Sequence, residues 1–207
     1  MKAAILLYPG VEPIDLATFG VLSMARRVAP QIGMFTVARE AGVVELANGL
    51  KVIADHGYAD APDADVLIVT GGPGWQDAAR CAATLAFVRA WPARGVTASV
   101  CTGAMILAAA GVLDGHAATT KQEVIGAEVS PLALLRDHHP RVEAVGALVV
   151  DDGRVVTGGG VTLCIDAMLY LIERFVGADA ARETARILEY SAAREANRAR
   201  LATRTAG

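Results

Sequence analysis

The sequence Val96-Thr97-Ala98-Ser99-Val100-Cys101-Thr102-Gly103-Ala104-Met105 passes from a short β-prone run into a segment rich in Ala and Leu. Ser99 and Gly103 stand two positions before and after Cys101. Small residues at that spacing are typical of a nucleophile elbow, a sharp turn from strand to helix, although the first position is usually Gly. The free N–H groups at the helix start lower the pKa of a neighbouring thiol. The stretch predicts a reactive cysteine, with a small buried cysteine as the alternative.

Composition limits the classes of protein to consider. The chain has 207 residues, of which 54% are hydrophobic and only 5% aromatic, so one domain over 1–207 with a core of Ala, Val, Leu and Ile is expected. The net charge of −3 gives no reason to expect a nucleic-acid or membrane partner. No apolar run approaches the roughly 18 residues that cross a bilayer.

Three cysteines without a C-x-x-C pair argue against a disulfide scaffold and a structural zinc site. They favour a reducing, cytoplasmic location. Adjacent His138 and His139 suggest a metal site, but neighbouring side chains point in different directions and no spaced third ligand follows, so we expect a loop and no metal. Cys81 and Cys164 lie in helical patterns and are expected to be core residues.

Apolar runs alternate with helical segments along the chain. Residues 2–8 and 64–70 are continuous apolar runs of the kind that form central parallel strands, and a helix is expected over 14–28. The other expected elements are a strand at 34–38, a hairpin within 43–53, a helical segment at 75–91, a short strand at 117–120, a short helix at 132–136, strands at 142–150 and 154–157, a helix at 161–176, and one long C-terminal helix at about 178–200. The alternation predicts a doubly wound, mostly parallel α/β sheet with helices on both faces.

Three features fall at the carboxyl ends of predicted strands, where such sheets hold their sites. They are Asp15, the loop Gly71-Gly72-Pro73-Gly74, and Cys101. The position of Asp15 by itself is better explained as a favourable charge in the first turn of a helix than as a functional carboxylate. The glycine-rich loop can offer N–H groups to an oxyanion, but it matches no nucleotide-binding pattern. Together the three supply a nucleophile, a proton acceptor and an oxyanion hole.

Five separated motifs resemble the DJ-1/PfpI superfamily, which is class I glutamine amidotransferase-like. They are Tyr8-Pro9-Gly10 with Ile14-Asp15-Leu16, Val66 to Gly74, Ser99 to Gly103, Leu113-Asp114-Gly115 with Ala118-Thr119-Thr120, and Gly159-Gly160-Val161 with Ile165-Asp166. Within the superfamily, Ile14-Asp15 and Cys101-Thr102-Gly103 are most similar to the isocyanide hydratase branch.

The resemblance implies a flavodoxin-like fold, a homodimer, no cofactor and a small-molecule substrate. It implies that Cys101 is the nucleophile and Asp15 its acidic partner. The oxyanion amides would be those of Gly72 and Thr102, with Gly71 beside them in the substrate-binding loop. The Thr102 hydroxyl would bond Asp15 or the substrate.

Two positions depart from common members of the superfamily. Thr102 stands where protease-like members carry His, and Thr119-Thr120-Lys121 stands where many relatives read Thr-Thr-His. With no histidine beside Cys101, a Cys-His peptidase triad is not expected. His116 is only a distant candidate.

Three functions are compatible with these residues. The first is hydration of an isocyanide to an N-formamide through a Cys101 thioimidate. The second is a glyoxalase-like reaction of the same residues with an α-oxoaldehyde. The third is a redox or stress sensor without turnover, in which Cys101 is oxidised.

Overall fold

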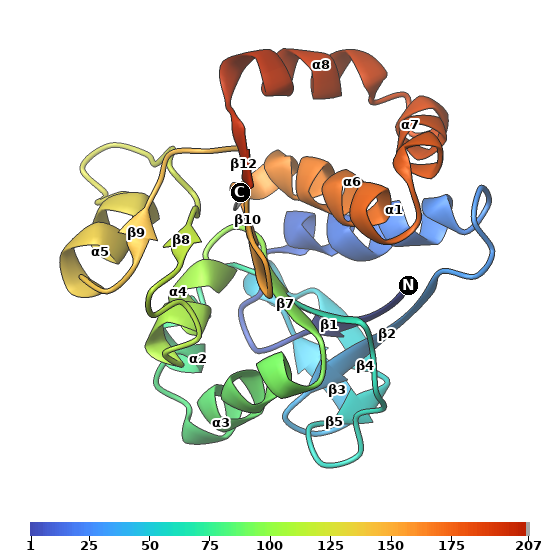
Figure 1. Cartoon of the computed structure of the whole chain (residues 1–207). Coiled ribbons are helices and arrows are strands. Elements are labelled where there is room, and N and C mark those ends of the chain that lie inside the picture. The colour runs from blue at the N-terminus through green and yellow to red at the C-terminus, as the bar shows by residue number, and fades with distance from the viewer. Residues whose placement is uncertain (206–207) are drawn as a thin grey trace.

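The computed structural model describes residues 1–205 and is built around an eight-stranded sheet (Figure 1). The strand order is β12-β10-β11-β7-β6-β1-β2-β5, and every pair in it is parallel except β10 with β11. The strands are β1 (Lys2–Leu6), β2 (Gly33–Ala38), β5 (His56–Gly57), β6 (Val66–Val69), β7 (Val96–Ser99), β10 (Val149–Asp152), β11 (Val155–Gly158) and β12 (Thr203–Thr205). The predicted doubly wound, mostly parallel fold is confirmed.

Two small ladders stand apart from the main sheet. They are β3 (Gly42–Glu45) antiparallel to β4 (Lys51–Ala54), and β8 (Ala117–Ala118) parallel to β9 (Glu143–Ala144). The first is the hairpin that the sequence predicts within 43–53.

Helices cover both faces of the sheet. Figure 1 shows α1, α6, α7 and α8 together on one side and α2, α3 and α4 on the other. Their bounds are α1 (Ala17–Ala25), α2 (Trp75–Ala78), α3 (Ala82–Ala90), α4 (Gly103–Ala109), α5 (Pro131–His138), α6 (Cys164–Phe175), α7 (Ala178–Ile187) and α8 (Ser191–Arg200). Within residues 1–205, no helix combines the length and apolar character needed to cross a membrane.

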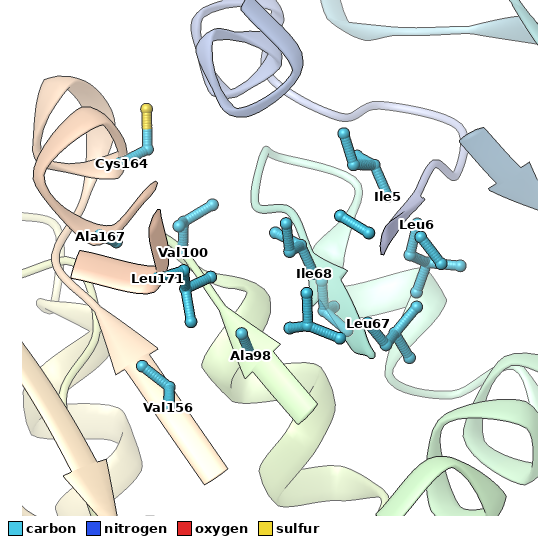
Figure 2. Packing of buried hydrophobic residues seen from close by; sticks show 14 of the residues in the cluster. Ile5, Leu6, Leu67, Ile68, Ala98, Val100, Val156, Cys164, Ala167 and Leu171 are labelled. Carbon is cyan, nitrogen blue, oxygen red and sulfur yellow. The ribbon is translucent and has the colours of Figure 1, made fainter. Parts of the chain in front are cut away.

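The core lies between these layers. Every residue of β6 is fully buried, as are Ala3–Leu6 of β1, which explains why both strands read as unbroken apolar runs. Figure 2 shows Ile5, Leu67 and Ile68 close together on neighbouring strands, with Leu171 of α6 beside Val100 and Cys164 farther along the same helix.

The expected single helix over about 178–200 is wrong. Glu189 adopts a left-handed backbone conformation (φ 55°), and the chain forms α7 and α8 as separate helices. The hydroxyl of Tyr190 then donates to Oδ2 of Asp166 in α6 at 2.8 Å. Ala, Arg, Leu and Glu make up most of the stretch and favour an unbroken helix, whereas the weaker helix formers Tyr190 and Ser191 lie at the break.

Three other expected elements also differ in detail. The helix expected over 14–28 begins as a 3-10 turn at Pro13–Leu16 and ends at Ala25. The segment over 75–91 is divided into α2 and α3, and the strand expected over 142–150 is divided into β9 and β10.

The order of the strands fixes where a site forms. From β1 the chain goes to β2 on one side, whereas β6 and β7 lie on the other side. Loops leaving β1 and β6 therefore diverge, and open α/β sheets bind ligands at such a switch point.

Candidate active site

Cys101 lies at the tip of the predicted elbow, between β7 and α4. Its backbone is left-handed (φ 52°), a conformation that costs a non-glycine residue free energy and needs support from its surroundings. Two hydrogen bonds supply that support: the Cys101 N–H donates to Gly159 O at 3.0 Å, and Thr120 Oγ1 donates to Cys101 O at 2.7 Å.

Two glycines allow the elbow to approach the neighbouring strand. A Cβ atom on Gly103 would lie 2.1 Å from Val69 O, and one on Gly71 would lie 2.5 Å from Thr102 N. Both distances are too short for any side chain, so the tight turn needs glycine at both positions.

Asp15 is completely buried in the turn after β1, next to this elbow. Its Oδ2 accepts a hydrogen bond from Gly71 N at 2.7 Å, whereas Oδ1 is buried with no partner in hydrogen-bond geometry. Burial raises the pKa of Asp15 to about 6, opposed by the Gly71 N–H and the nearby Cys101 thiol. Asp15 is therefore mostly a carboxylate at neutral pH, with one oxygen available to take a proton.

The Cys101 thiol is only 4% exposed. Burial, followed by the charge of Asp15, raises its pKa to about 11, although the N–H groups of Val161 and Thr102 act in the opposite direction. The expectation of a lowered thiol pKa is wrong for the unliganded protein, because desolvation outweighs the helix start. Before reaction, Cys101 is therefore a neutral thiol and Asp15 beside it is a carboxylate.

The Thr102 hydroxyl bonds the glycine-rich loop in this structure. Gly72 N donates to Thr102 Oγ1 at 2.9 Å, and Gly71 N is taken by Asp15. The two N–H groups that face the Cys101 sulfur are those of Thr102 and Val161. Val161 follows the glycines that end β11 and has a left-handed backbone (φ 55°), which a β-branched residue rarely adopts. Sequence reasoning missed its amide, and the preceding Gly159-Gly160 is the only local signal for it.

A cleft of about 740 Å³ opens onto the sulfur. Its wall is largely apolar and is lined by Glu12, Ile14, Gly72, Pro73, Trp75, Gln76, Cys101, Thr102, Lys121, Val124, Glu128, Val129, Pro131, Leu134 and Val161. A small apolar group attached to an electrophilic carbon suits such a wall.

The histidines lie elsewhere. His116 Nδ1 is 3.2 Å from Asp152 Oδ2, and His138 and His139 line a separate cavity with Arg141. In the described range 1–205, no three His, Cys, Asp or Glu side chains are arranged to hold a metal ion.

The other two cysteines have different surroundings. Cys164 is fully buried in α6, with its Sγ 3.9 Å from Ile14 O, as expected of a core residue. Cys81 instead is half-buried at the start of α3, where hydrogen bonds from the side chain and N–H of Thr84 lower its pKa. The core position expected for Cys81 is therefore wrong.

Comparison with known proteins finds similarity over most of the chain. A sequence profile described as the DJ-1/PfpI family matches residues 1–174. An isonitrile hydratase of Pseudomonas putida is 34% identical over 201 residues, covering 93% of this chain and 80% of that protein. The HTH-type transcriptional regulator GbdR of Pseudomonas aeruginosa is 32% identical over 188 residues, which are 80% of this chain but only 49% of the regulator.

Among solved structures, a THiJ/PfpI family protein from Pseudomonas syringae superposes with a TM-score of 0.79 at 29% identity. The match covers 92% of this chain and 75% of that chain.

Proposed function

The chain belongs to the DJ-1/PfpI family, and from this membership we propose that it is a cysteine-dependent enzyme that hydrates an isocyanide to an N-formamide. The observation that carries the proposal is the buried Cys101 thiol, which lines an apolar cleft, with the buried Asp15 carboxylate beside it. The similarity to an isonitrile hydratase supports the same chemistry.

The first step forms the carbon–sulfur bond. The Asp15 carboxylate takes the thiol proton while Cys101 sulfur attacks the terminal carbon of the isocyanide. The N–H groups of Val161 and Thr102 face the sulfur and stabilise the charge that develops on it. Proton removal during attack avoids a free thiolate, which burial makes unfavourable.

The second step returns the proton. Protonated Asp15 delivers it to the carbon that sulfur has attacked, which gives a covalent thioimidate, S–CH=N–R. A pKa of about 6 suits this exchange, because Asp15 can accept and donate a proton near neutral pH.

Water completes the reaction. Asp15, again a carboxylate, removes a proton from a water molecule that adds to the thioimidate carbon. Asp15 passes this proton to the nitrogen of the adduct. Collapse of the adduct then breaks the carbon–sulfur bond and releases the formamide, R–NH–CHO, while the proton of the added hydroxyl returns to the sulfur through Asp15. One water is consumed and the thiol is regenerated.

The test is incubation with an aryl isocyanide, with formamide measured by chromatography and protein adducts by mass spectrometry. We expect turnover in the wild type and in Cys81→Ala, and none in Cys101→Ala. Absence of both formamide and a Cys101 adduct in the wild type would rule out this function.

A second candidate reaction uses the same groups on an α-oxoaldehyde. The thiol would add to the aldehyde, and the Asp15 carboxylate would move a proton between the adjacent carbons before water releases a hydroxy acid. Lactate formation from methylglyoxal that is lost in Cys101→Ala would favour it. A sensor without turnover is less well supported, since the 4% exposure and raised pKa of Cys101 both slow its oxidation.

The partners we propose are this small electrophile and a second copy of the chain. The homodimer remains a prediction, which light scattering of the purified protein checks by its mass.

A further inference from the structure

Two contacts hold the chain at Lys121 close to Cys101. The preceding residue, Thr120, donates its hydroxyl to Cys101 O at 2.7 Å. The stem of Lys121 lies over Gly160, where a Cβ atom would be 2.7 Å from Lys121 Cβ and Cγ. Gly160 is followed by Val161, whose N–H faces the Cys101 sulfur. The position of Lys121 is thus tied to that of the reacting atom.

The ammonium of Lys121 is the single cation among the residues that line the cleft. It donates to the carbonyl of Glu123 and forms no ion pair within residues 1–205. An ammonium carries three N–H donors and binds anionic acceptors more strongly than neutral ones. Lys121 therefore has capacity for an anionic partner that the protein itself does not provide.

The sulfur is not that partner. Of the five influences on the pKa of Cys101, the charge of Lys121 is the smallest, after burial, Asp15 and two backbone N–H groups.

Glu12 and Glu128 are the two acidic residues that line the cleft, and both repel an anionic group. Glu12 lies near Asp15, whose pKa its charge raises, so that wall repels anions. Glu128 is exposed and accepts from Ile125 N at 3.4 Å. Lys121, a half-buried residue, is left as the attractive point on the lining.

We propose that Lys121 determines specificity by binding a carboxylate or similar anionic group that the substrate carries a few atoms from the carbon attacked by Cys101. The inference rests on the proposed nucleophilic role of Cys101. It adds a substrate class: small electrophiles that bear a negative charge.

Two alkylating agents test this without turnover. Iodoacetate and iodoacetamide present the same reacting carbon, and only iodoacetate is charged. In both reactions a bond forms between Cys101 sulfur and carbon, the carbon–iodine bond breaks, iodide leaves with the electron pair, and the thiol proton passes to Asp15 or water. Peptide mass spectrometry follows Cys101 separately from Cys81.

The measured quantity is the ratio of the two alkylation rates at Cys101. We expect Lys121→Met and Lys121→Gln to lower the iodoacetate-to-iodoacetamide ratio by about fivefold, the size of a partly exposed ion pair. Lys121→Arg should restore most of the ratio. The matched control is Lys51→Met, which removes the same charge from an exposed site on the β3–β4 hairpin and should leave the ratio unchanged.

The outcomes separate the two proposals. If Cys101 is alkylated but the ratio in both Lys121→Met and Lys121→Gln equals that of the wild type, the role of Lys121 is overturned and the proposed function stands. If neither reagent modifies Cys101 in the wild type, the nucleophile assignment fails and the specificity proposal fails with it.

Discussion

The backbone N–H of Gly72 donates a 2.9 Å hydrogen bond to the side-chain oxygen of Thr102. This bond joins the loop after β6 to the start of α4, across the floor of the cleft. The amide of Gly72 can therefore bind an oxyanion only after the Thr102 hydroxyl turns away, whereas the amides of Thr102 and Val161 already face the sulfur.

Substitutions at Thr102 measure how much its hydrogen bond with Gly72 contributes to stability. Thr102→Val leaves the buried Gly72 N–H without an acceptor and should lower the free energy of unfolding by about 1–3 kcal/mol. Thr102→Ser keeps the oxygen and should lose much less. Urea unfolding of both variants measures the difference, and equal stabilities would show that the hydrogen bond contributes little.

The activity is expected to fall in acid. Because the proposed reaction uses the Asp15 carboxylate as its base and the pKa of Asp15 is about 6, kcat/KM should decrease tenfold per pH unit below about pH 6. The rate of Cys101 alkylation should fall in the same way below about pH 6. Asp15→Asn should lack this decrease and should be slow at every pH, so a wild-type profile that stays flat down to pH 5 would contradict the role of Asp15 as the base.

Asp15→Asn should stabilise the protein at neutral pH while it removes activity. The folded-state pKa of about 6 lies above the ordinary value of 3.8, so folding favours protonated Asp15 and the wild type loses stability as the pH rises from about 4 to 6. Asn is neutral and can still accept from Gly71 N. We expect the variant to gain about 2 kcal/mol relative to the wild type at pH 7.5, and much less at pH 4. Denaturant unfolding at both pH values checks the sign.

General thiol reagents should react with Cys81 before Cys101. Cys81 is half-buried with a lowered pKa, whereas Cys101 is buried with a raised one. Thiol titration at pH 7 in the absence of substrate should show a fast phase that Cys81→Ser removes. A fast phase that survives in Cys81→Ser and disappears in Cys101→Ser would mean that Cys101 is more reactive than its surroundings indicate.

Alanine substitutions at Gly103 and Gly20 should change the stability of the protein in opposite directions. Gly103→Ala would place a methyl group 2.1 Å from Val69 O, and it should destabilise the protein by about 3 kcal/mol or more, or prevent folding. Gly20→Ala adds a methyl group within α1 with no atom within 4 Å, and it should stabilise by about 0.5–1 kcal/mol. Thermal unfolding distinguishes them, and similar melting temperatures would contradict the close approach at the elbow.

The central buried strands and the meeting of the catalytic candidates follow from the sequence. Unbroken apolar runs predict the buried strands β1 and β6, and small residues around Cys101 predict its sharp turn. Because parallel strands end at one edge of a sheet, the proximity of Asp15 to Cys101 follows from the topology alone.

Only the tertiary structure decided the properties that depend on surroundings. Cys101 lies beside a helix start, which predicts a low pKa, but the depth of its burial and the charge of Asp15 raise it. The break at Glu189 lies within a stretch made mostly of Ala, Arg, Leu and Glu, and it is accompanied by the bond from Tyr190 to Asp166, which is distant in sequence. Local sequence determines the conformations that a segment prefers, whereas desolvation and long-range contacts arise only when separate segments pack together.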